Sequence, residues 1–243
     1  LVATSIGGNP EAVHIAYATD DASGLLYASV SPQGEVHHES IPDAVENGNA
    51  RHISIAASDA GQPHIAFRDE SQRALKHAVR TVDDTWEISP IDGCATEPGC
   101  PDLSNEDFGE YTSIVLVGNE PRISFYDRFR GDLKLAVRNS NKSWEVSTVD
   151  GRDVQTGIDT ADVGRFARME VDHSLRLAIA YADTTHRALK YYFPSGANPE
   201  PFFVDIGSTE YPMDGVLRRH AVGSHVDLAF DEQGRAHLIY LDS

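Results

Sequence analysis

Four short segments of the chain carry the side chains best suited to ligand chemistry, and each lies just before an apolar run. The candidates for ligand contact are Arg51, His52, Glu110, Tyr111, Arg165, His220 and His225, with Phe166 beside Arg165. Arginine can hold a carboxylate or sugar hydroxyls through charge-assisted, bidentate hydrogen bonds, to which the other groups can add. If these segments converge in space, they form a binding site. Otherwise they satisfy loop backbone groups or pair with acidic neighbours.

The same residues contain the parts of a polysaccharide-acting enzyme. A lyase needs a base, an acid and a cation that neutralises a uronate carboxylate. These roles could fall to His52, His220 or His225 as base, Tyr111 as acid, and Arg51 or Arg165 as cation. A glycoside hydrolase instead needs two carboxylates about 5 to 10 Å apart. The loop candidates for that pair are Glu110 with Asp102 or Glu106.

The charge balance limits the partners. The chain has 243 residues, of which 20 are Lys or Arg and 38 are Asp or Glu, for a net charge of −18. It has no basic cluster that could attract phosphate groups, so we expect no nucleic-acid partner. The same charge repels polyanionic chains and disfavours the lyase unless the site itself is basic. No apolar run approaches the roughly 18 residues of a membrane span, and residues 1–4 do not resemble a signal peptide, so we expect a processed, soluble chain without membrane insertion.

The two cysteines indicate a compartment. Cys94 and Cys100 lie six positions apart around Pro98-Gly99, and this turn chemistry lets them close a small surface loop as a disulfide. Free thiols are the alternative. A zinc site would need four ligands, and no histidine is near in the sequence, so we expect no metal and no cofactor. A disulfide implies an oxidising compartment, which predicts an extracellular or periplasmic location.

An internal repeat organises the elements that would position these residues. When the chain is aligned with itself so that Pro63 meets Pro121, a long segment matches without a gap. The identities on this diagonal also include Ile65 with Ile123, Phe67 with Phe125, Asp69 with Asp127, Leu75-Lys76 with Leu133-Lys134, and Trp86-Glu87 with Trp144-Glu145. So many identities on one diagonal do not arise by chance, and the chain contains a duplicated unit.

Weaker copies flank this pair. Each copy has an apolar run that ends in an aromatic residue and is followed by an aspartate. The aromatic residues are Tyr17, Phe67, Phe125, Tyr181 and Tyr240. The intervals between them are nearly equal, and each is long enough for one sheet-sized unit per repeat.

Each unit contains four short runs with the two-residue period of β-strands. In the second copy they are residues 53–57, 64–69, 74–80 and 86–91, with turn residues 58–63 between the first two. This pattern predicts an all-β fold, a β-propeller with four-stranded antiparallel blades, four full repeats and a partial fifth. We expect one propeller over residues 1–243, or a fragment of one, with blades at about 1–43, 53–92, 113–150, 168–206 and 226–243. A two-sheet sandwich is the alternative, but it does not explain the long period.

The repeat resembles a known group of propeller repeats. Its pattern is a Gly/Pro turn, His-Ile-Ala with Tyr or Phe, an Asp, and then Leu-Lys-x-Ala. This pattern resembles the repeats of secreted bacterial proteins in the BNR, or sialidase-like, group, and the resemblance covers nearly the whole chain. It implies a blade rather than an activity. The Asp-box of true sialidases, Ser-x-Asp-x-Gly-x-x-Trp, is not present, because Trp86 and Trp144 follow Asp-Asp-Thr and Asn-Lys-Ser without the glycine.

Residues that recur in the units are expected to be structural. The aromatic residues should pack between blades. The recurring aspartates should accept N–H groups of the following turn, with a ring of calcium ligands as the alternative: Asp20, Asp69, Asp127, Asp183 and Asp242. Lys76, Lys134 and Lys190 should be exposed or paired with aspartate at small energetic value, and His14, His64 and His237 should make a fixed hydrogen bond. Functional residues should lie where the repeats differ, in the connections 43–52, 92–112, 150–167 and 205–225, which meet at one end of the central channel.

Two functions remain open. The first is an extracellular recognition module or scaffold that binds glycan or protein at the channel-end loops; the sequence has no nucleophile elbow, H-E-x-x-H motif or phosphate loop. The alternative is a lyase or glycoside hydrolase with its active site at the same channel mouth. Because the fifth unit is half made, we also expect a missing segment or a second chain to complete the ring. A five-bladed ring with a two-stranded last blade is the other arrangement.

Overall fold

The computed structural model describes residues 12–19, 24–45, 49–92, 107–151, 161–197, 199–207 and 220–242. Within these ranges the chain forms 17 β-strands and no helix. The strands make five sheets, and in each sheet they pair antiparallel in chain order. We number these sheets blades 1 to 5.

Three of the five blades have the expected four strands. Blade 2 contains β4 (Ala50–Ala57), β5 (Pro63–Asp69), β6 (Ala74–Arg80) and β7 (Trp86–Asp92). Blade 3 contains β8 (Phe108–Val117), β9 (Glu120–Asp127), β10 (Asp132–Arg138) and β11 (Trp144–Asp150). Blade 4 contains β12 (Val163–Val171), β13 (Leu177–Asp183), β14 (Ala188–Tyr192) and β15 (Phe202–Asp205).

The first and last blades are smaller in the described part of the chain. Blade 1 contains β1 (Val13–Tyr17), β2 (Leu25–Val30) and β3 (Val36–Ile41). The strand expected before β1 falls within residues 1–11, which lie outside the described residues, as does Asp20. Blade 5 contains β16 (Val222–Phe230) and β17 (Ala236–Asp242).

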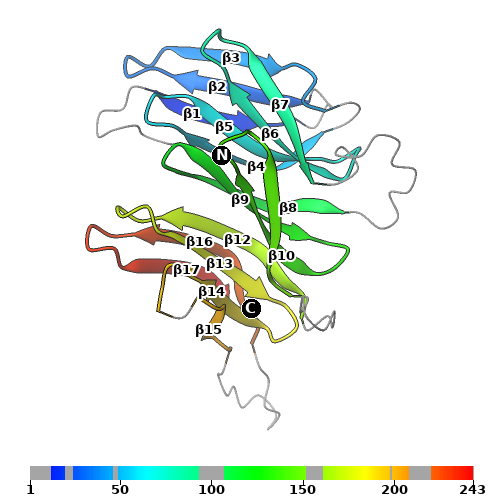
Figure 1. The fold of residues 1–243 in the computed structure, drawn as a ribbon, viewed down its shortest axis with the longest axis vertical. Coiled ribbons are helices and arrows are strands. Elements are labelled where there is room, and N and C mark those ends of the chain that lie inside the picture. Colours follow the sequence, from blue (N-terminus) through cyan, green and yellow to red (C-terminus); the bar gives the residue numbers. More distant parts are fainter. Residues whose placement is uncertain are drawn as a thin grey trace.

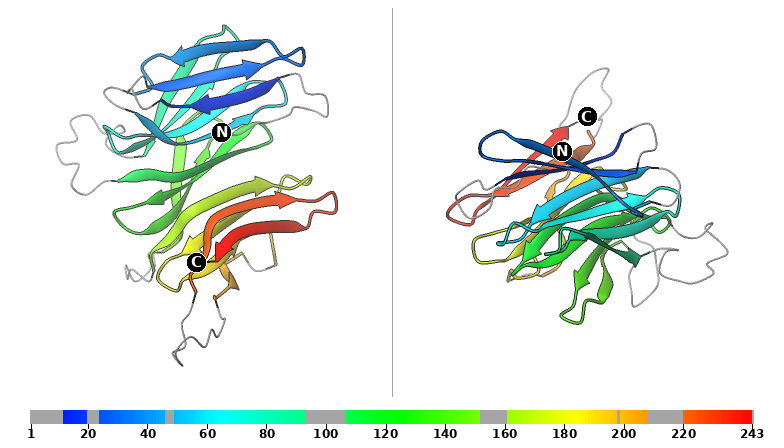
Figure 2. Two further views of the ribbon diagram at one scale, coloured as in Figure 1. Left: turned by 180° about the vertical axis from the view of Figure 1, so that it is seen from behind. Right: turned by 90° about the horizontal axis from the view of Figure 1, so that it is seen from above.

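Blades 1 to 4 follow one another in sequence order along the long axis of the molecule, from blue to yellow, and blade 5 (red) lies beside blade 4 (Figure 1). Figure 2 shows the same order from behind. Equivalent positions tie the first strands of neighbouring blades together. The Ile114 N–H donates to Ser54 Oγ at 3.1 Å, and the Met169 N–H donates to Ser113 Oγ at 3.0 Å. These bonds fix β4, β8 and β12 as the inner strands of the propeller.

The core lies between successive blades, as the repeat predicts. Phe67, Phe125 and Tyr181 are all 0% exposed and belong to three different inter-blade clusters. The hydroxyls of Tyr181 and Tyr240 also donate to Asp150 and Asp205 at 2.6 Å. Each acceptor is the final residue of the last strand of the preceding blade. The recurring tyrosine therefore packs at the interface between two blades and also joins them by a hydrogen bond.

The recurring aspartates cap turns, as expected. Asp69 Oδ1 accepts the N–H groups of Ser71 and Gln72 at 3.0 and 3.2 Å, while Lys76 Nζ lies 2.7 Å from Asp69 Oδ2. Burial alone would raise the pKa of Asp69, but the hydrogen bonds from Lys76 and Ser71 lower it.

The recurring lysines Lys76, Lys134 and Lys190 are paired with aspartates, one of the two expected arrangements, and none of them is exposed. Lys76 and Lys190 are only 8% and 9% exposed. Their aliphatic stems are buried, while each ammonium meets a buried aspartate, Asp69 for Lys76 and Asp183, at 4.0 Å, for Lys190. Removing one partner of such a buried pair destabilises the protein far more than removing one partner of a surface pair, because the other charge is left buried and unpaired.

Blade 2 buries a histidine pair. His64 Nδ1 lies 3.1 Å from His77 Nε2, and the two side chains are 5% and 0% exposed. The fixed hydrogen bond expected of the recurring histidines is present here, at His14 with Tyr27, and at His237 with Asp231. Burial, followed by the nearby Arg138, lowers the pKa of His64 to about 4. Burial also holds the pKa of His77 well below its ordinary value of 6.5.

We expect the protein to lose stability on mild acidification because of this pair. Both histidines have a folded-state pKa below the unfolded one, so their contribution is complete above about pH 6.5 and is lost as the pH falls toward 4. For His64 alone the loss is on the order of 3 kcal/mol. Urea unfolding between pH 7 and 4.5 measures it. The double variant His64→Asn, His77→Phe should show a shallower pH dependence, and an equal slope in both proteins would contradict the assignment.

Candidate functional site

The inner strands share an irregularity that builds the site. The pairing register of β4, β8, β12 and β16 shifts at the same place in each blade. The residues at the shift have positive φ angles, and they are His52 (50°), Tyr111 (51°), Phe166 (55°) and His225 (51°). Positive φ is sterically unfavourable for residues with a Cβ, and at a bulge it turns a side chain out of the regular alternation. Four aromatic or imidazole rings are therefore held in one uncommon conformation.

A glycine two residues earlier lets the backbone approach the preceding blade. Gly109 and Gly164 have φ angles of 88° and 102°, and each lies against the repeat-equivalent leucine of the preceding blade. A Cβ on Gly164 would lie 2.8 Å from the Cα of Leu133, closer than side chains pack. In blades 3 to 5 a glycine two residues before the ring thus encodes both the close approach and the turned ring, whereas in blade 2 Ala50 stands at that position before His52.

The four rings form a continuous row across blades 2 to 5. Their centroids are 5.2 Å apart for His52 and Tyr111, 4.7 Å for Tyr111 and Phe166, and 4.7 Å for Phe166 and His225. His52, Tyr111 and Phe166 are partly exposed, and His225 is exposed. We call these four residues the aromatic row. Burial raises the pKa of Tyr111, so its hydroxyl remains protonated at neutral pH, and burial lowers the pKa of His52.

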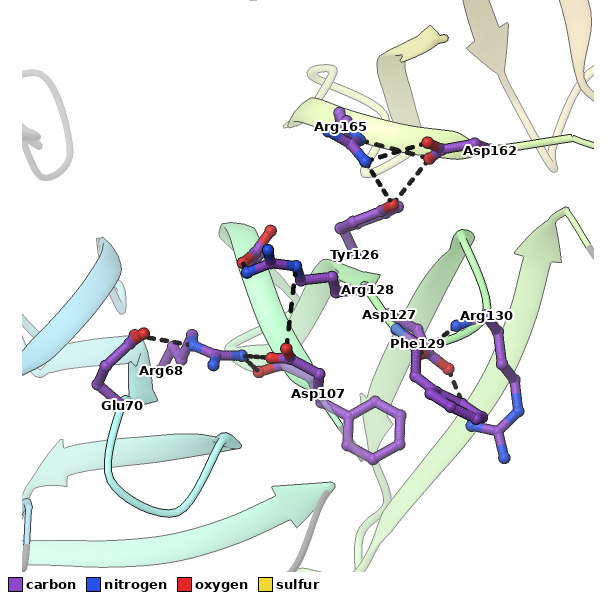
Figure 3. Close-up of polar contacts among 12 residues, drawn as sticks. Arg68, Glu70, Asp107, Tyr126, Asp127, Arg128, Phe129, Arg130, Asp162 and Arg165 are labelled. Atoms are coloured by element: carbon purple, nitrogen blue, oxygen red, sulfur yellow. Dashed lines mark hydrogen bonds and ion pairs between the residues drawn. The ribbon is translucent and has the colours of Figure 1, made fainter. Parts of the chain in front are cut away.

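Polar groups at the same end of the blades are locked together. Arg165 donates to Asp162 Oδ2 at 3.0 Å and to the Tyr126 hydroxyl at 3.1 Å, and that hydroxyl donates to Asp162 Oδ1 at 2.8 Å (Figure 3). The Tyr126 ring lies 6.1 Å from the Tyr111 ring, which connects this cluster to the aromatic row. Burial, together with the hydrogen bond to Asp162, raises the pKa of Tyr126.

A second cluster lies beside the first. Arg68, buried, binds Asp107 and donates to Glu70 at 2.9 Å (Figure 3). Arg128 lies 3.2 Å from Glu110 and 4.0 Å from Asp107. These carboxylates are therefore tied to arginines from neighbouring turns.

The first blade interface adds a pocket at this end. It has a volume of about 300 Å³ and is lined by residues that include Asn49, Arg51 and His52. The Arg51 side chain is exposed, and none of the described residues forms an ion pair with it. It is a cation available to a ligand at one end of the aromatic row.

The structure brings most of the residues selected from the sequence to one place. His52, Tyr111 and His225 are members of the aromatic row, and Arg51, Glu110 and Arg165 each precede a member. Glu110 and Arg165 are paired with Arg128 and Asp162, the alternative that loop residues pair with charged neighbours.

His220 is placed differently. Its Nδ1 lies 3.4 Å from Asp242 Oδ1, and it precedes β16 rather than occupying the bulge. Ser224 is the equivalent of Arg51, Glu110 and Arg165. Asp102, Glu106, Cys94 and Cys100 lie outside the described residues.

Some residues of the site were missed in the sequence. Phe166 was expected beside Arg165 at the channel mouth but was not selected as a ligand contact, although Gly164-Arg165-Phe166 repeats Gly109-Glu110-Tyr111 and Gly223-Ser224-His225. This short recurring motif is the signal that identifies the row. Tyr126 and Asp162 carry no comparable signal, because their meeting depends on the packing of blade 3 against blade 4.

A pair of carboxylates further along the inner strands was also missed. Glu170 on β12 is partly buried, and burial, then the charge of Asp227 on β16, raises its pKa. Asp227 itself accepts a hydrogen bond from Arg168 Nε at 3.2 Å. One carboxyl is thus favoured to hold a proton beside a second that is paired with a cation.

Neither a metal cluster nor a membrane helix is found where the structure can be described. There, no three His, Cys, Asp or Glu side chains come close enough together to hold a metal ion. No helix in those same ranges has the length and apolar character to cross a membrane.

Comparison with known proteins shows the fold. The sequence matches no protein-family model and no curated protein. Among solved structures, the chain is similar to the Aleuria aurantia lectin in complex with Fucα1-6GlcNAc, with 13% identity, a TM-score of 0.51, and 84% of this chain and 61% of the lectin covered. It is similar to the Cellvibrio cellulosa α-L-arabinanase, with 13% identity, a TM-score of 0.51, and 98% and 94% covered. It is also similar to a puromycin hydrolase, with 12% identity, a TM-score of 0.55, and 97% and 35% covered.

At these identities the likeness extends to architecture alone, and the chain is a β-propeller protein. It spans about three fifths of the length of the Aleuria lectin chains that it matches, 61% and 58%. The expected β-propeller architecture is confirmed.

Replacing Phe166 by glycine should leave a more stable protein than replacing it by alanine. Both variants lose the ring, but only glycine adopts the positive φ of this position without strain, so we expect a difference of about 1 kcal/mol in the free energy of unfolding. Phe230 lies in a regular part of β16 and provides the control, since there alanine should exceed glycine. Chemical denaturation of the four variants tests this. The same order at both positions would contradict the strained conformation.

Proposed function

We propose that this protein recognises carbohydrate at the aromatic row, as a binding module. The observation that carries the proposal is the row itself, four adjacent rings held at an unfavourable φ. Strain of this kind is found where a functional side chain must be aimed. The C–H groups of sugar rings pack against aromatic faces, whose negative charge attracts polarised hydrogens.

The polar groups beside the row support a binding role. Arg165, Tyr126 and Asp162 form a closed network, and Arg128 and Glu110 pair next to Tyr111. A preorganised set of donors and acceptors can receive sugar hydroxyls without rearranging. Arg51, exposed beside the pocket of about 300 Å³, can take a carboxylate or a hydroxyl at the end of the row.

The similar structures give independent support. One protein of similar fold is a lectin solved in complex with Fucα1-6GlcNAc, and another is an α-L-arabinanase. The repeats resemble those of secreted bacterial propellers, which supports an extracellular or periplasmic setting for this function. A protein ligand at the same row is the other form of the recognition hypothesis.

Removing rings from the row should abolish binding. We expect Tyr111→Ala and Phe166→Ala each to weaken glycan binding about tenfold or more, because each removes a stacking surface. The measurement is a glycan array followed by calorimetry with the best ligand. Phe202→Ala, which removes an exposed phenylalanine from the outer strand β15, is the matched control and should bind normally. Unchanged binding in both row variants would overturn the assignment of the site.

A glycoside hydrolase is the second candidate, favoured by the carboxylates Glu170 and Asp227. A general acid needs a carboxyl with a raised pKa, and Glu170 has one because of its burial and the nearby Asp227. We prefer Glu170 to Glu110 as the acid because burial raises the pKa of Glu170, whereas Glu110 is paired with Arg128.

If the chain hydrolyses polysaccharide, Glu170→Gln should reduce the release of reducing ends by at least about a hundredfold, because the proton donor is lost. Glu145→Gln on the outer strand β11, where Glu145 is exposed, should leave the rate unchanged. The assay uses a panel of neutral and acidic polysaccharides. No release from any of them by the unmodified protein would exclude the hydrolase within that panel, and ultraviolet-absorbing unsaturated products would indicate a lyase.

A further inference from the structure

Two clefts of matching construction lie at the end of the blades opposite the aromatic row. There the turn between the first and second strands meets the turn between the third and fourth. Cleft 1, between blades 1 and 2, has a volume of about 260 Å³. Cleft 2, between blades 2 and 3, has a volume of about 400 Å³. Both are at the small end of ligand pockets, so each suits one small ring rather than a long chain.

The walls of the two clefts are repeat equivalents. The alignment that brings Pro63 onto Pro121 also converts the blade 2 wall of cleft 1 into the blade 3 wall of cleft 2. The other corresponding residues are Gln62 and Glu120, Arg80 and Arg138, and Asp84 and Lys142. On the facing wall, His14 of blade 1 corresponds to His64 of blade 2.

A buried histidine stands at the back of each cleft. In cleft 1, His14 is 5% exposed and its Nδ1 lies 2.5 Å from the Tyr27 hydroxyl. Its Nε2 has no hydrogen-bond partner among the described residues. In cleft 2, His64 is also 5% exposed and is held by His77. A buried, unpaired polar atom is costly, and a ligand in cleft 1 would satisfy this one.

The arginine of each cleft forms only long ion pairs. Arg80 Nη2 lies 3.6 Å from Asp84 Oδ1 in cleft 1, and Arg138 Nη2 lies 3.8 Å from Glu87 Oε1 in cleft 2. These distances exceed those of good hydrogen bonds. The Nε atoms of both arginines are buried without a hydrogen-bond partner in the described part of the chain. Each cleft therefore holds a donor and an acceptor side by side with capacity to spare.

This chemistry fits a neutral, hydroxyl-rich ring. Each sugar hydroxyl both donates and accepts, so it can bridge an arginine and a carboxylate that are slightly too far apart to bond directly. Positive and negative groups occur together in both clefts, which gives no preference for a strongly charged ligand. Pro63 and Pro121 supply an apolar wall for the ring carbons.

We infer that clefts 1 and 2 each bind one monosaccharide unit, so that the chain is bivalent at this end. The inference does not extend to the third interface, because Leu177 and Pro194 stand there at the positions of Pro121 and Arg138. Two sites on one rigid body would bind a multivalent glycan surface far more tightly than a single sugar. This binding is independent of the aromatic row.

The two tryptophans of the chain give each cleft its own signal. Trp86 packs on Tyr27 of cleft 1 with ring centroids 5.2 Å apart, and Trp144 packs on His77 behind cleft 2 at 5.3 Å. The full chain is titrated with methyl glycosides of glucose, galactose, mannose, fucose and N-acetylglucosamine while tryptophan fluorescence is recorded. We expect a saturable change with at least one of them. In the Trp86→Phe variant the remaining change should come from cleft 2 alone.

Arginine variants test the site. Arg80→Ala should remove the cleft 1 signal and Arg138→Ala the cleft 2 signal, each weakening its site at least about tenfold. Arg235→Ala removes an exposed arginine that pairs with Asp231 in the turn between β16 and β17 and lines neither cleft, so it should leave both signals intact. Thermal melting checks that each variant folds. If an alanine variant melts early, the lysine variant at that position should still weaken its own cleft alone.

The outcomes separate this inference from the proposed function. Saturable binding that survives the Arg80→Ala, Arg138→Ala double variant would overturn it. So would the absence of any fluorescence or ligand-observed NMR response to all five glycosides at tens of millimolar. If binding is lost in Phe166→Ala but not in the double variant, the aromatic row is the glycan site and the clefts are not. Loss in the double variant with normal binding in Phe166→Ala supports the clefts and counts against the row.

Discussion

The packing of each sheet onto the next is the interaction on which the rest of this structure depends. A propeller blade buries both of its faces, so every blade must supply two apolar surfaces that fit its neighbours. Phe67, Phe125 and Tyr181 are fully buried at these interfaces, and the pairs of Lys76 with Asp69 and Lys134 with Asp127 stiffen the strand ends beside them. Because the spacing between blades is set there, the inner strands can lie near enough for their rings to touch.

The sequence predicts what the repeat makes regular. The identities between the two best-matching copies marked the four strands of blade 2 and blade 3, since a side chain that recurs in every unit has the same surroundings each time. The burial of Lys76 could not be inferred in that way. Lysine is usually exposed, and only the meeting of two sheets shows that its stem is covered and its ammonium neutralised by Asp69.

The sequence predicted which segments form the site but not which position of each segment carries the ring. Loops before the inner strands were the right region, and both His220 and His225 were selected there. The bulge that follows Gly223 places His225 in the row with Phe166, whereas His220 precedes β16 and lies near Asp242. The cluster of Arg165, Tyr126 and Asp162 was beyond reach, because its members come from two blades and meet only after those blades have packed.

The shared bulge gives the backbone the same conformation whichever ring the residue carries. Histidine, tyrosine and phenylalanine all occupy the same conformation, which is imposed by the strand and its neighbour rather than by the side chain. Each blade can therefore exchange its ring while the backbone conformation stays the same. A protein built in this way can acquire new ligand preferences one substitution at a time. A designer could exchange the rings among the four positions without changing the backbone.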